Sequence, residues 1–272
     1  MQKFSASPQE MFLSFWKNRH LIQSLVYREV VGRYKGSMLG IFWSLINPIF
    51  MLAVYTFVFS VVFKARWNSG SDSRAEFALI LFAGLLVFNL FSECVNRSPG
   101  LILGNVNYVK RVVFPLEVLP WVTMGAALFH FLISICVWVV AYLFFIGIPP
   151  WTILFLPFVI IPFAFFVMGL SWALASLGVY LRDSGQIVAM LITVLMFLSP
   201  IFFPVSSLPP RFQTIMYLNP MTQPIEMVRD VMYWGQIPSI GRWLFMVVIS
   251  FAISFLGFAW FQKTRKGFAD VL

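Results

Sequence analysis

The sequence has few charged residues, and this scarcity indicates what surrounds the folded chain. Only 11% of its 272 residues are Asp, Glu, Lys or Arg, whereas 60% are hydrophobic. A soluble domain usually carries about 25% charged residues, which it needs to cover a surface facing water. The composition therefore argues against an ordinary soluble protein. It predicts an all-α integral membrane protein, because a helix satisfies its own backbone hydrogen bonds in lipid.

Residues that hold metals or perform catalysis are also scarce. The two cysteines, Cys94 and Cys136, give neither a disulfide framework nor a metal-ligand spacing. No paired carboxylates stand in the hydrophobic runs, and the sequence has no G-x-x-x-x-G-K-[ST] phosphate loop. His130 is a lone histidine, which we interpret as a packed or hydrogen-bonded residue. We therefore expect no catalytic residue, no metal site and no cofactor in this chain.

Six hydrophobic runs are candidate membrane spans, since a bilayer core about 30 Å thick needs about 20 helical residues. They are Leu39–Phe63, Phe77–Phe91, Pro115–Ile146, Trp151–Tyr180, Gln186–Phe203 and Arg242–Phe261. We interpret residues 1–272 as a single transmembrane domain. Within it, residues 1–38 form cytoplasmic interface and pre-span helices, residues 39–261 form a six-span bundle, and residues 262–272 form a cytoplasmic tail.

The basic residues predict the orientation of these spans. If the N-terminus is in the cytoplasm, thirteen of the 19 Lys and Arg residues fall on inner segments and six on outer ones. Cytoplasmic segments are generally enriched in Lys and Arg. We therefore expect a multi-pass protein with both termini in the cytoplasm. The net charge of +9 then reflects orientation and contact with membrane lipids, not nucleic-acid binding.

The N-terminal segment has the pattern of a helix at the membrane interface. Ser7-Pro8-Gln9-Glu10 predicts a helix start, with Ser7 as the N-cap and Glu10 closing a capping box. The apolar residues that follow fall on one side of this helix: Met11, Phe12, Phe15 and Trp16. An amphipathic interface helix has this pattern, and so does a helix that packs against the bundle.

The region between the fifth and sixth runs is rich in proline and still apolar. Pro204–Gly241 contains six prolines, and neither half of it is long enough to span a membrane. We expect two short helices here, broken at Asn219-Pro220. They either dip into the outer leaflet as a re-entrant pair or form a structured outer loop.

Polar residues gather in three predicted cytoplasmic segments: Arg28–Lys35, Asn105–Arg111 and Leu181–Ser184. Orientation and binding of anionic lipid headgroups would explain the basic residues, but not Asn105 or Tyr108. Three glycines spaced four residues apart, Gly32, Gly36 and Gly40, mark the start of the first span. They either allow close approach of two backbones or provide turns.

Several of these segments resemble one known family. Residues 28–40 (REVVGRYKGSMLG), followed by Trp43 and Asn47-Pro48, look like the segment that leads into the first span of ABC transporter permeases of the polysaccharide-export family. Further segments resemble that family in order along nearly the whole chain: Phe114–Pro120, Tyr180–Asp183, Ser199–Pro204 and Leu218–Pro220.

The resemblance implies a permease subunit that moves a polyprenyl-linked polysaccharide from the cytoplasmic side across the bacterial inner membrane. O-antigen is the first expectation; capsular polysaccharide and teichoic acid precursors are other cargoes of the family. It also implies a separate cytoplasmic ABC ATPase subunit that binds ATP and magnesium, so that this chain is not itself an enzyme. The residues on which that ATPase would dock are Arg28, Glu29, Arg33, Asn105, Asn107, Tyr108, Lys110, Arg111, Arg182 and Asp183.

A polysaccharide needs a wide path, and one six-helix chain is too small to enclose it. We therefore expect a homodimer around a two-fold axis. Sugar rings stack their C–H faces on aromatic rings, while their hydroxyl groups need polar neighbours. One face of the first span offers both kinds of group at helical spacing, and we expect it to line the substrate path: Ser44, Asn47, Met51, Tyr55 and Phe59. Asn47 beside Pro48 is equally explained as a helix kink.

Two alternative functions fit the same architecture. The first is a permease for a smaller lipid, teichoic acid or a drug. The second is a membrane-embedded transferase acting on a polyprenyl sugar. A transferase would need acidic residues or metal ligands at the membrane surface, where the sequence places only Glu117 and Asp183.

Overall fold

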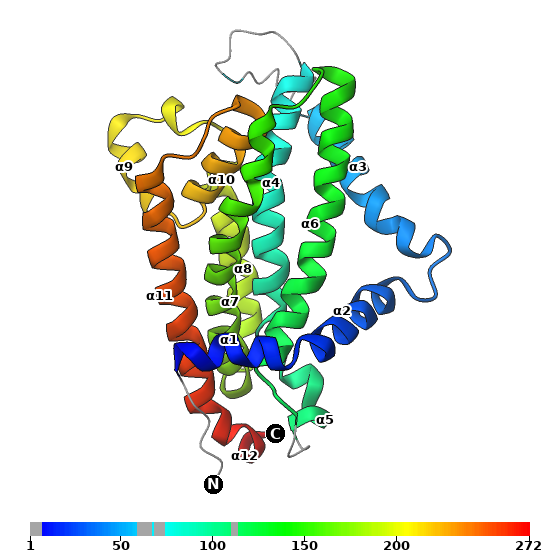
Figure 1. The fold of residues 1–272 in the computed structure, drawn as a ribbon, viewed down its shortest axis with the longest axis vertical. Helices are drawn as coiled ribbons and strands as arrows, with labels where there is room; N and C mark the ends of the chain where they lie inside the picture. Colours follow the sequence, from blue (N-terminus) through cyan, green and yellow to red (C-terminus); the bar gives the residue numbers. More distant parts are fainter. Residues whose placement is uncertain (1–6, 59–66, 68–73, 110–113) are drawn as a thin grey trace.

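The computed structural model describes residues 7–58, 67, 74–109 and 114–272, and the regular structure of this part of the chain is helical (Figure 1). The α-helices are α1 (Pro8–Lys17), α2 (Arg19–Tyr34), α3 (Trp43–Tyr55), α4 (Arg74–Arg97), α5 (Val106–Val109), α6 (Val118–Phe145), α7 (Leu156–Tyr180), α8 (Ser184–Leu198), α9 (Pro210–Leu218), α10 (Thr222–Arg229), α11 (Ile240–Thr264) and α12 (Phe268–Val271). The predicted all-α class is thereby confirmed for the described residues.

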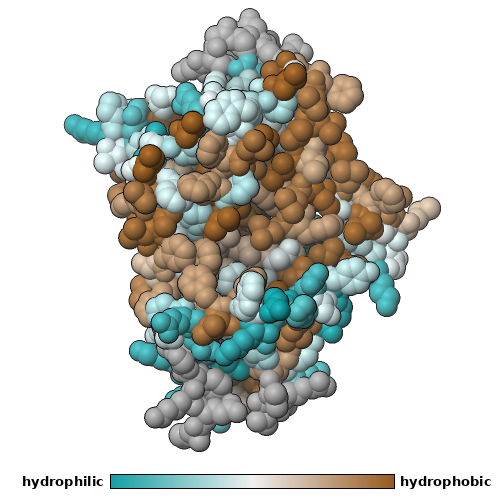
Figure 2. Space-filling model, viewed as in Figure 1, coloured by the Kyte–Doolittle hydropathy of each residue, from teal (hydrophilic) through white to brown (hydrophobic). Residues whose placement is uncertain are grey.

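Within the described residues, five helical segments are long and apolar enough to cross a membrane. They are Gly40–Val58, Ala75–Arg97, Val118–Phe145, Trp151–Tyr180 and Ile240–Val271. Figure 2 shows hydrophobic surface around the middle of the molecule and hydrophilic residues mainly toward its two ends. Five of the six predicted spans are thus found as long apolar helices, although residues 59–63 of the first lie outside the described residues.

The other predicted span, Gln186–Phe203, is shorter than expected. Its helix, α8, has 15 residues and ends at Leu198. Ser199 is extended, with φ −95° and ψ 151°, because a residue that precedes a proline is sterically excluded from the helical region. The second span is longer than predicted: α4 continues to Arg97, beyond Phe91, because the polar residues at its end pair with α2 and α6.

The core forms around α4, α7 and α11. In α4, 83% of the apolar stretch that can cross a membrane is buried, and its hydrophobic residues pack on every side. Helices α7 and α11 approach each other through Gly169 and Gly257, where an added Cβ would collide with the backbone of the facing helix. Small residues at such crossings allow close packing without a hydrophobic driving force from water.

Helix α1 lies across one end of the bundle, and α2 continues from it (Figure 1). As predicted, the Ser7 side chain caps α1 by accepting a hydrogen bond from the Glu10 N–H at 3.2 Å. Met11 is buried, and the Phe12 ring contacts Phe165 and Phe251. The interpretation of α1 as a helix that packs on the bundle is therefore correct. Trp16 remains exposed, which leaves it available to lipid headgroups.

Glycines at the junction of α2 and α3 act as turns. Gly36 and Gly40 have φ values of +87° and +54°, a region that side chains other than glycine rarely adopt. An added Cβ at Gly32, Gly36 or Gly40 would meet nothing within 4 Å. Of the two interpretations, the turn is therefore correct for Gly36 and Gly40, and close backbone packing is not seen.

The opposite end of the bundle carries the predicted pair of short helices, α9 and α10. They are separated at Asn219-Pro220, as expected. The Asn219 side chain holds this break by donating to Leu198 O at 3.0 Å and accepting from the Met221 N–H at 2.9 Å. Helix α10 is largely buried against α4, whereas α9 is exposed (Figure 1).

Candidate functional site: a polar groove between three spans

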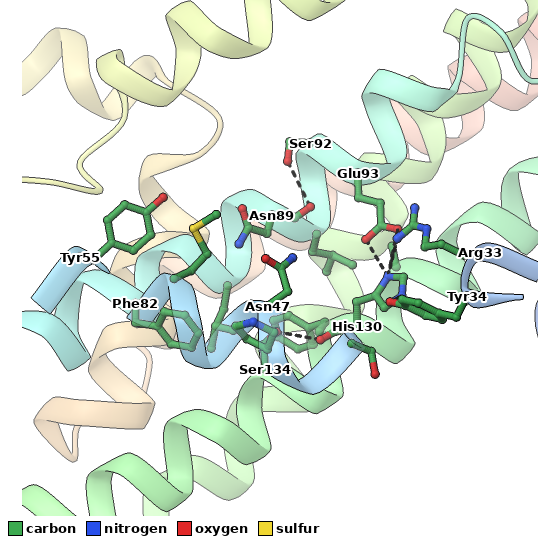
Figure 3. Close-up of a pocket in the computed structure, with 17 residues that line it drawn as sticks. Arg33, Tyr34, Asn47, Tyr55, Phe82, Asn89, Ser92, Glu93, His130 and Ser134 are labelled. Atoms are coloured by element: carbon green, nitrogen blue, oxygen red, sulfur yellow. Dashed lines mark hydrogen bonds and ion pairs between the residues drawn. The ribbon is translucent and has the colours of Figure 1, made fainter. Parts of the chain in front are cut away.

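Three spans, α3, α4 and α6, enclose a groove with a volume of about 310 Å³ that begins at the C-terminal end of α2. Figure 3 shows how its side chains are distributed. Arg33, Glu93 and His130 gather at one end of the groove, and Tyr55 and Phe82 lie toward the other. Between them are amide and hydroxyl side chains: Asn47, Asn89, Ser92 and Ser134. The groove therefore combines hydrogen-bonding groups with aromatic rings.

The groove collects most of the face that was predicted to line a substrate path. Ser44, Asn47, Met51 and Tyr55 all border it. Phe59, the fifth residue of that face, lies outside the described residues. The Ser44 hydroxyl is used locally, because it donates to Ile41 O at 2.6 Å. The structure thus brings four of the five residues together, and their role as a path stays a prediction.

The kink interpretation of Asn47-Pro48 is compatible with the same location. Pro48 lies inside α3. It has no N–H to donate to the carbonyl of Ser44, one turn earlier. The Ser44 carbonyl and the Asn47 side-chain amide therefore lie next to the groove. Water or a hydroxyl-rich ligand in the groove can form hydrogen bonds with both groups.

A cluster of charged and polar side chains closes the end of the groove next to α2. The Glu93 carboxylate lies 2.8 Å from Arg33 Nη1 and 3.0 Å from His130 Nδ1. The Tyr34 hydroxyl lies 3.0 Å from the other ring nitrogen of His130. With its proton on Nδ1, the imidazole donates to Glu93 and accepts from Tyr34. This Glu93 cluster (Arg33, Tyr34, Glu93 and His130) ties α2 to α4 and α6.

The Glu93 cluster was partly missed from the sequence. His130 is hydrogen-bonded, as expected, but the second span was predicted to end at Phe91, and Glu93 was not among the predicted site residues. The signal was present, because Asn89, Ser92 and Glu93 fall at helical spacing on one face of a continuing helix. Arg33 was predicted to meet an ATPase, and the structure shows it paired within the chain.

The other predicted docking residues that the structure describes lie at the same end of the molecule as α1. Arg28 donates to the Tyr108 hydroxyl at 2.7 Å, and the Tyr108 ring stacks on Phe114 with 4.2 Å between centroids. Glu29 forms an ion pair with Arg97 at the end of α4. Helix α2 is therefore joined both to α5 and to the core helix α4.

The remaining docking residues differ in what they contact. The Asn105 side chain donates to Leu101 O at 2.9 Å, so it supports the turn before α5. Asn107 is exposed. Lys110 and Arg111 lie outside the described residues. In the loop between α7 and α8, Arg182 and Asp183 are both exposed, and Gly178 brings the end of α7 against the backbone of Pro99. The described parts of the three polar segments thus lie toward the same end of the bundle as α1 (Figure 1).

A further ion pair fixes the last span at this end. Glu117 forms an ion pair with Arg265 and lies 3.3 Å from the Ser14 hydroxyl, which donates to it. Arg265 also donates to Phe114 O at 2.9 Å. This Glu117 clamp (Ser14, Phe114, Glu117 and Arg265) joins α1, the start of α6 and the end of α11.

Apolar spans around a polar groove, with paired charges gathered at one end, define a helical membrane permease. Residues 20–233 match the family of ABC-2 type transporters, to which this chain therefore belongs. That family consists of transmembrane permeases without a catalytic ATPase domain, so the expectation that this chain is not an enzyme is confirmed.

Several curated proteins are similar over nearly the full length of the chain. The O-antigen export system permease protein RfbA of Myxococcus xanthus is 27% identical, over 94% of this chain and 96% of that protein. RfbA of Klebsiella pneumoniae is 26% identical over 93% and 95%. The polysialic acid transport protein KpsM of Escherichia coli is 24% identical over 90% and 93%. The predicted resemblance to polysaccharide-export permeases is thereby confirmed.

Proposed function

We propose that this chain is the membrane-spanning subunit of an ATP-driven exporter for a lipid-linked polysaccharide, with O-antigen as the first candidate cargo. The observation that carries the proposal is the groove between α3, α4 and α6. It presents amides and hydroxyls beside Tyr55 and Phe82, as a path for sugar rings requires. The names of the similar proteins support the class of cargo.

Six membrane crossings are part of this proposal. Helix α7 ends beside Pro99 at the α1 end, and α8 starts there. The segment after α8 reaches the opposite end, where Pro200 O and Ile201 O accept hydrogen bonds from Arg229. Fifteen residues of α8 cover about 22 Å, and the segment from Ser199 onward adds the remainder. An even number of crossings agrees with α1 and α12 lying at one end (Figure 1).

The α1 end faces the cytoplasm of a bacterial cell in this proposal, and the membrane is the inner membrane. The excess of basic residues on this end supports the orientation. A separate ATPase subunit, which binds ATP and magnesium, docks there on α5, the loop between α7 and α8, and the exposed face of α2. The contacts from Arg28 to Tyr108 and from Glu29 to Arg97 would carry its movements toward the groove.

A second copy of the chain completes the path in this proposal. A groove of about 310 Å³ has room for only a small part of a polysaccharide. Helix α3, which forms one of its walls, has only 11% of its spanning window buried within the chain. Two-fold pairing of such permeases would bring two grooves together and cover the exposed sides of α3.

Deletion of the gene tests the proposed function. Surface polysaccharide should be lost, and lipid-linked glycan should accumulate inside the cell. A cell that displays its polysaccharide normally without this chain would contradict the proposal and favour a smaller lipid or a drug as cargo.

Complementation with variants then tests the groove. Tyr55→Ala should lower export about three- to tenfold, in the range that loss of one aromatic contact produces. Phe245→Ala is the control, because Phe245 is exposed on α11 and borders neither the groove nor the exposed side of α3. Surface polysaccharide is measured beside immunoblots of membrane abundance. If both variants lose export equally and in proportion to their membrane abundance, Tyr55 contributes only to packing and does not line a substrate path.

A further inference from the structure

A second polar cavity lies at the end of the bundle opposite α1, among α9, α10 and the start of α11. Its volume is about 310 Å³, and it shares no lining residue with the groove between α3, α4 and α6. Helix α10 and the following π-helical turn, Asp230–Trp234 (η6), supply most of one wall. In the orientation proposed above, this end of the bundle is the outer one, where exported cargo emerges.

The floor of this cavity is built by a buried cation whose hydrogen bonds are directed to the backbone. Arg229 is 3% exposed. It donates to Ile80 O at 3.0 Å and to Ile201 O at 2.7 Å, and also bonds to Pro200 O. Its guanidinium lies 4.5 Å from the centre of the Trp67 ring. Because its donors point to carbonyl groups, Arg229 holds the ends of α4 and α8 together and is poorly placed to bind an anion.

Two carboxylates, Glu226 and Asp230, border the cavity one helical turn apart. Burial raises the pKa of both groups, and the neighbouring Asp230 charge raises the pKa of Glu226 further. Arg242 also borders the cavity and partly offsets their charge. A carboxyl group in such a place can accept a hydrogen bond when ionised and donate one when protonated.

Aromatic rings complete the lining. Tyr217 and Trp234 border the same cavity and are 46% and 36% exposed. Gln213 and Gln236 add amide groups. A purely apolar ligand would offer no hydrogen bond to Glu226 or Asp230 and would remove both groups further from water, at a substantial desolvation cost. A phosphate would be repelled by them. A ligand with many hydroxyl groups and apolar ring faces fits both the rings and the carboxylates.

We propose that this cavity is a sugar-binding site at the exit of the path, where one sugar unit of the glycan stacks on Trp234 or Tyr217 and its hydroxyl groups bond to Glu226 and Asp230. The inference rests on the proposed function, because that function supplies the glycan. A weak site here would receive successive sugar units as they emerge and oppose their return into the membrane.

Saturation-transfer difference NMR on the purified full-length protein in nanodiscs tests this site. The probe is the delipidated surface polysaccharide of the source strain, hydrolysed to short fragments. Sugar ring protons should receive saturation from the wild-type protein. The Kd of the fragments should rise about tenfold in Trp234→Ala, through loss of stacking, and in Glu226→Gln, through loss of a charged acceptor.

Two control variants separate this site from its alternatives. Phe212→Ala removes an exposed ring of α9 that does not border the cavity, and it should bind like the wild type. Tyr55→Ala alters only the groove between α3, α4 and α6, and it should retain binding at the exit cavity. Loss of binding in Tyr55→Ala with full binding in Trp234→Ala would overturn the inference.

The outcome for the exit site is distinguishable from that for export itself. If deletion of the gene abolishes surface polysaccharide, but the fragments bind the wild type, Trp234→Ala and Glu226→Gln equally or bind none of them, the sugar site is wrong and the exporter stands. If deletion leaves the surface polysaccharide unchanged, the exporter assignment fails, and the sugar site fails with it. Size-exclusion profiles confirm that each variant is folded before it is compared.

Discussion

Helices α3 and α4 face each other across the groove, and the protein holds them very differently. The two helices are similarly apolar along the stretch that can cross a membrane. Yet only 11% of this stretch is buried in α3, compared with 83% in α4. Buried hydrogen bonds tie α4 in place, among them one from Trp138 Nε1 to Leu79 O at 2.9 Å. The groove therefore has one wall anchored in the core and one wall held by few contacts within the chain.

This difference indicates how a permease can combine stability with movement. The core helices resist separation because many van der Waals contacts and polar bonds would have to break together. Helix α3 takes part in few of these contacts, so we expect it to move more easily than α4. The Glu93 cluster lies between the tightly packed core and the loosely held α3. Its hydrogen bonds and ion pairs join α2, which directly precedes α3, to α4 and α6.

The largest effect should come from the anchored part. Gly257→Leu would force a side chain into the backbone of Gly169, where α11 meets α7. Because two well-packed spans cannot separate without losing the contacts between them, we expect folded protein to fall below about a tenth of the wild-type level. Membrane abundance and size-exclusion profiles measure this.

Gly241→Leu is the control for that substitution. Gly241 lies in the same helix, and an added Cβ there would meet nothing within 4 Å. The control should keep most of its abundance. If Gly257→Leu accumulates as well as Gly241→Leu, α7 and α11 are not the rigid pair that the comparison with α3 requires.

Local features of this fold follow from local sequence patterns. The cap at Ser7 and the break at Asn219-Pro220 depend on a few neighbouring residues, so their prediction was confirmed. The shared face of Ser44, Asn47, Met51 and Tyr55 follows from helical periodicity alone. The end of α8 at Leu198 should also have been predicted, because Pro200 disfavours a helical Ser199.

Features that depend on tertiary contacts could not be predicted in the same way. Tyr34, Glu93 and His130 are far apart in the sequence, and nothing local to any of them indicates the other two. The same limit applies to burial: α3 and α4 are about equally apolar, and only the packing distinguishes them. The two polar cavities are therefore products of the assembled helices.

A smaller effect should come from weakening the Glu117 clamp. Arg265→Gln removes the countercharge of the Glu117 carboxylate, which keeps its hydrogen bond from the Ser14 hydroxyl, and it also removes a donor to Phe114 O. Both side chains of the ion pair are largely buried, so a carboxylate would stay buried without its countercharge. We expect the apparent Tm in detergent to fall by several degrees, on the order of 5 °C.

Lys266→Gln is the matched control for that measurement, because Lys266 is exposed beside the clamp. It should leave the apparent Tm within about 1 °C of wild type. If Arg265→Gln melts like Lys266→Gln, the end of α11 is held by its contacts with α7, such as the hydrogen bond from the Tyr180 hydroxyl to Thr264 O, and the anchored part of the molecule does not depend on the clamp.

The Glu93 cluster tests the link between the anchored and the loosely held parts. Glu93→Gln keeps the size of the side chain but removes the charge that holds Arg33 and His130. Because the Arg33 side chain is 40% exposed, the pair contributes at most about 1 kcal/mol to stability. We expect normal abundance, and export lowered about three- to fivefold because α2 transmits its movement less well.

ATP hydrolysis by the purified complex separates this explanation from simple destabilisation. In Glu93→Gln it should continue at nearly the wild-type rate while export falls. Asp270→Asn, which removes an exposed carboxylate at the same end of the molecule, should change neither quantity. A parallel fall in abundance and export would make the cluster an ordinary structural contact.

The smallest effect should come from a single hydroxyl group. Tyr108→Phe keeps the ring that stacks on Phe114 and removes only the acceptor for Arg28, which ties α2 to α5. A hydrogen bond to a charged group contributes about 1.5–3 kcal/mol when it is well shielded, and this one is exposed, so its loss should cost much less. We expect export to fall about twofold, with full abundance. Thr193→Val is the control, because it removes an exposed hydroxyl that bonds only within α8, to Ala189 O, away from α2 and α5. If Tyr108→Phe lowers export as much as Glu93→Gln does, the contact of α2 with α5 matters as much for export as its contact with α4.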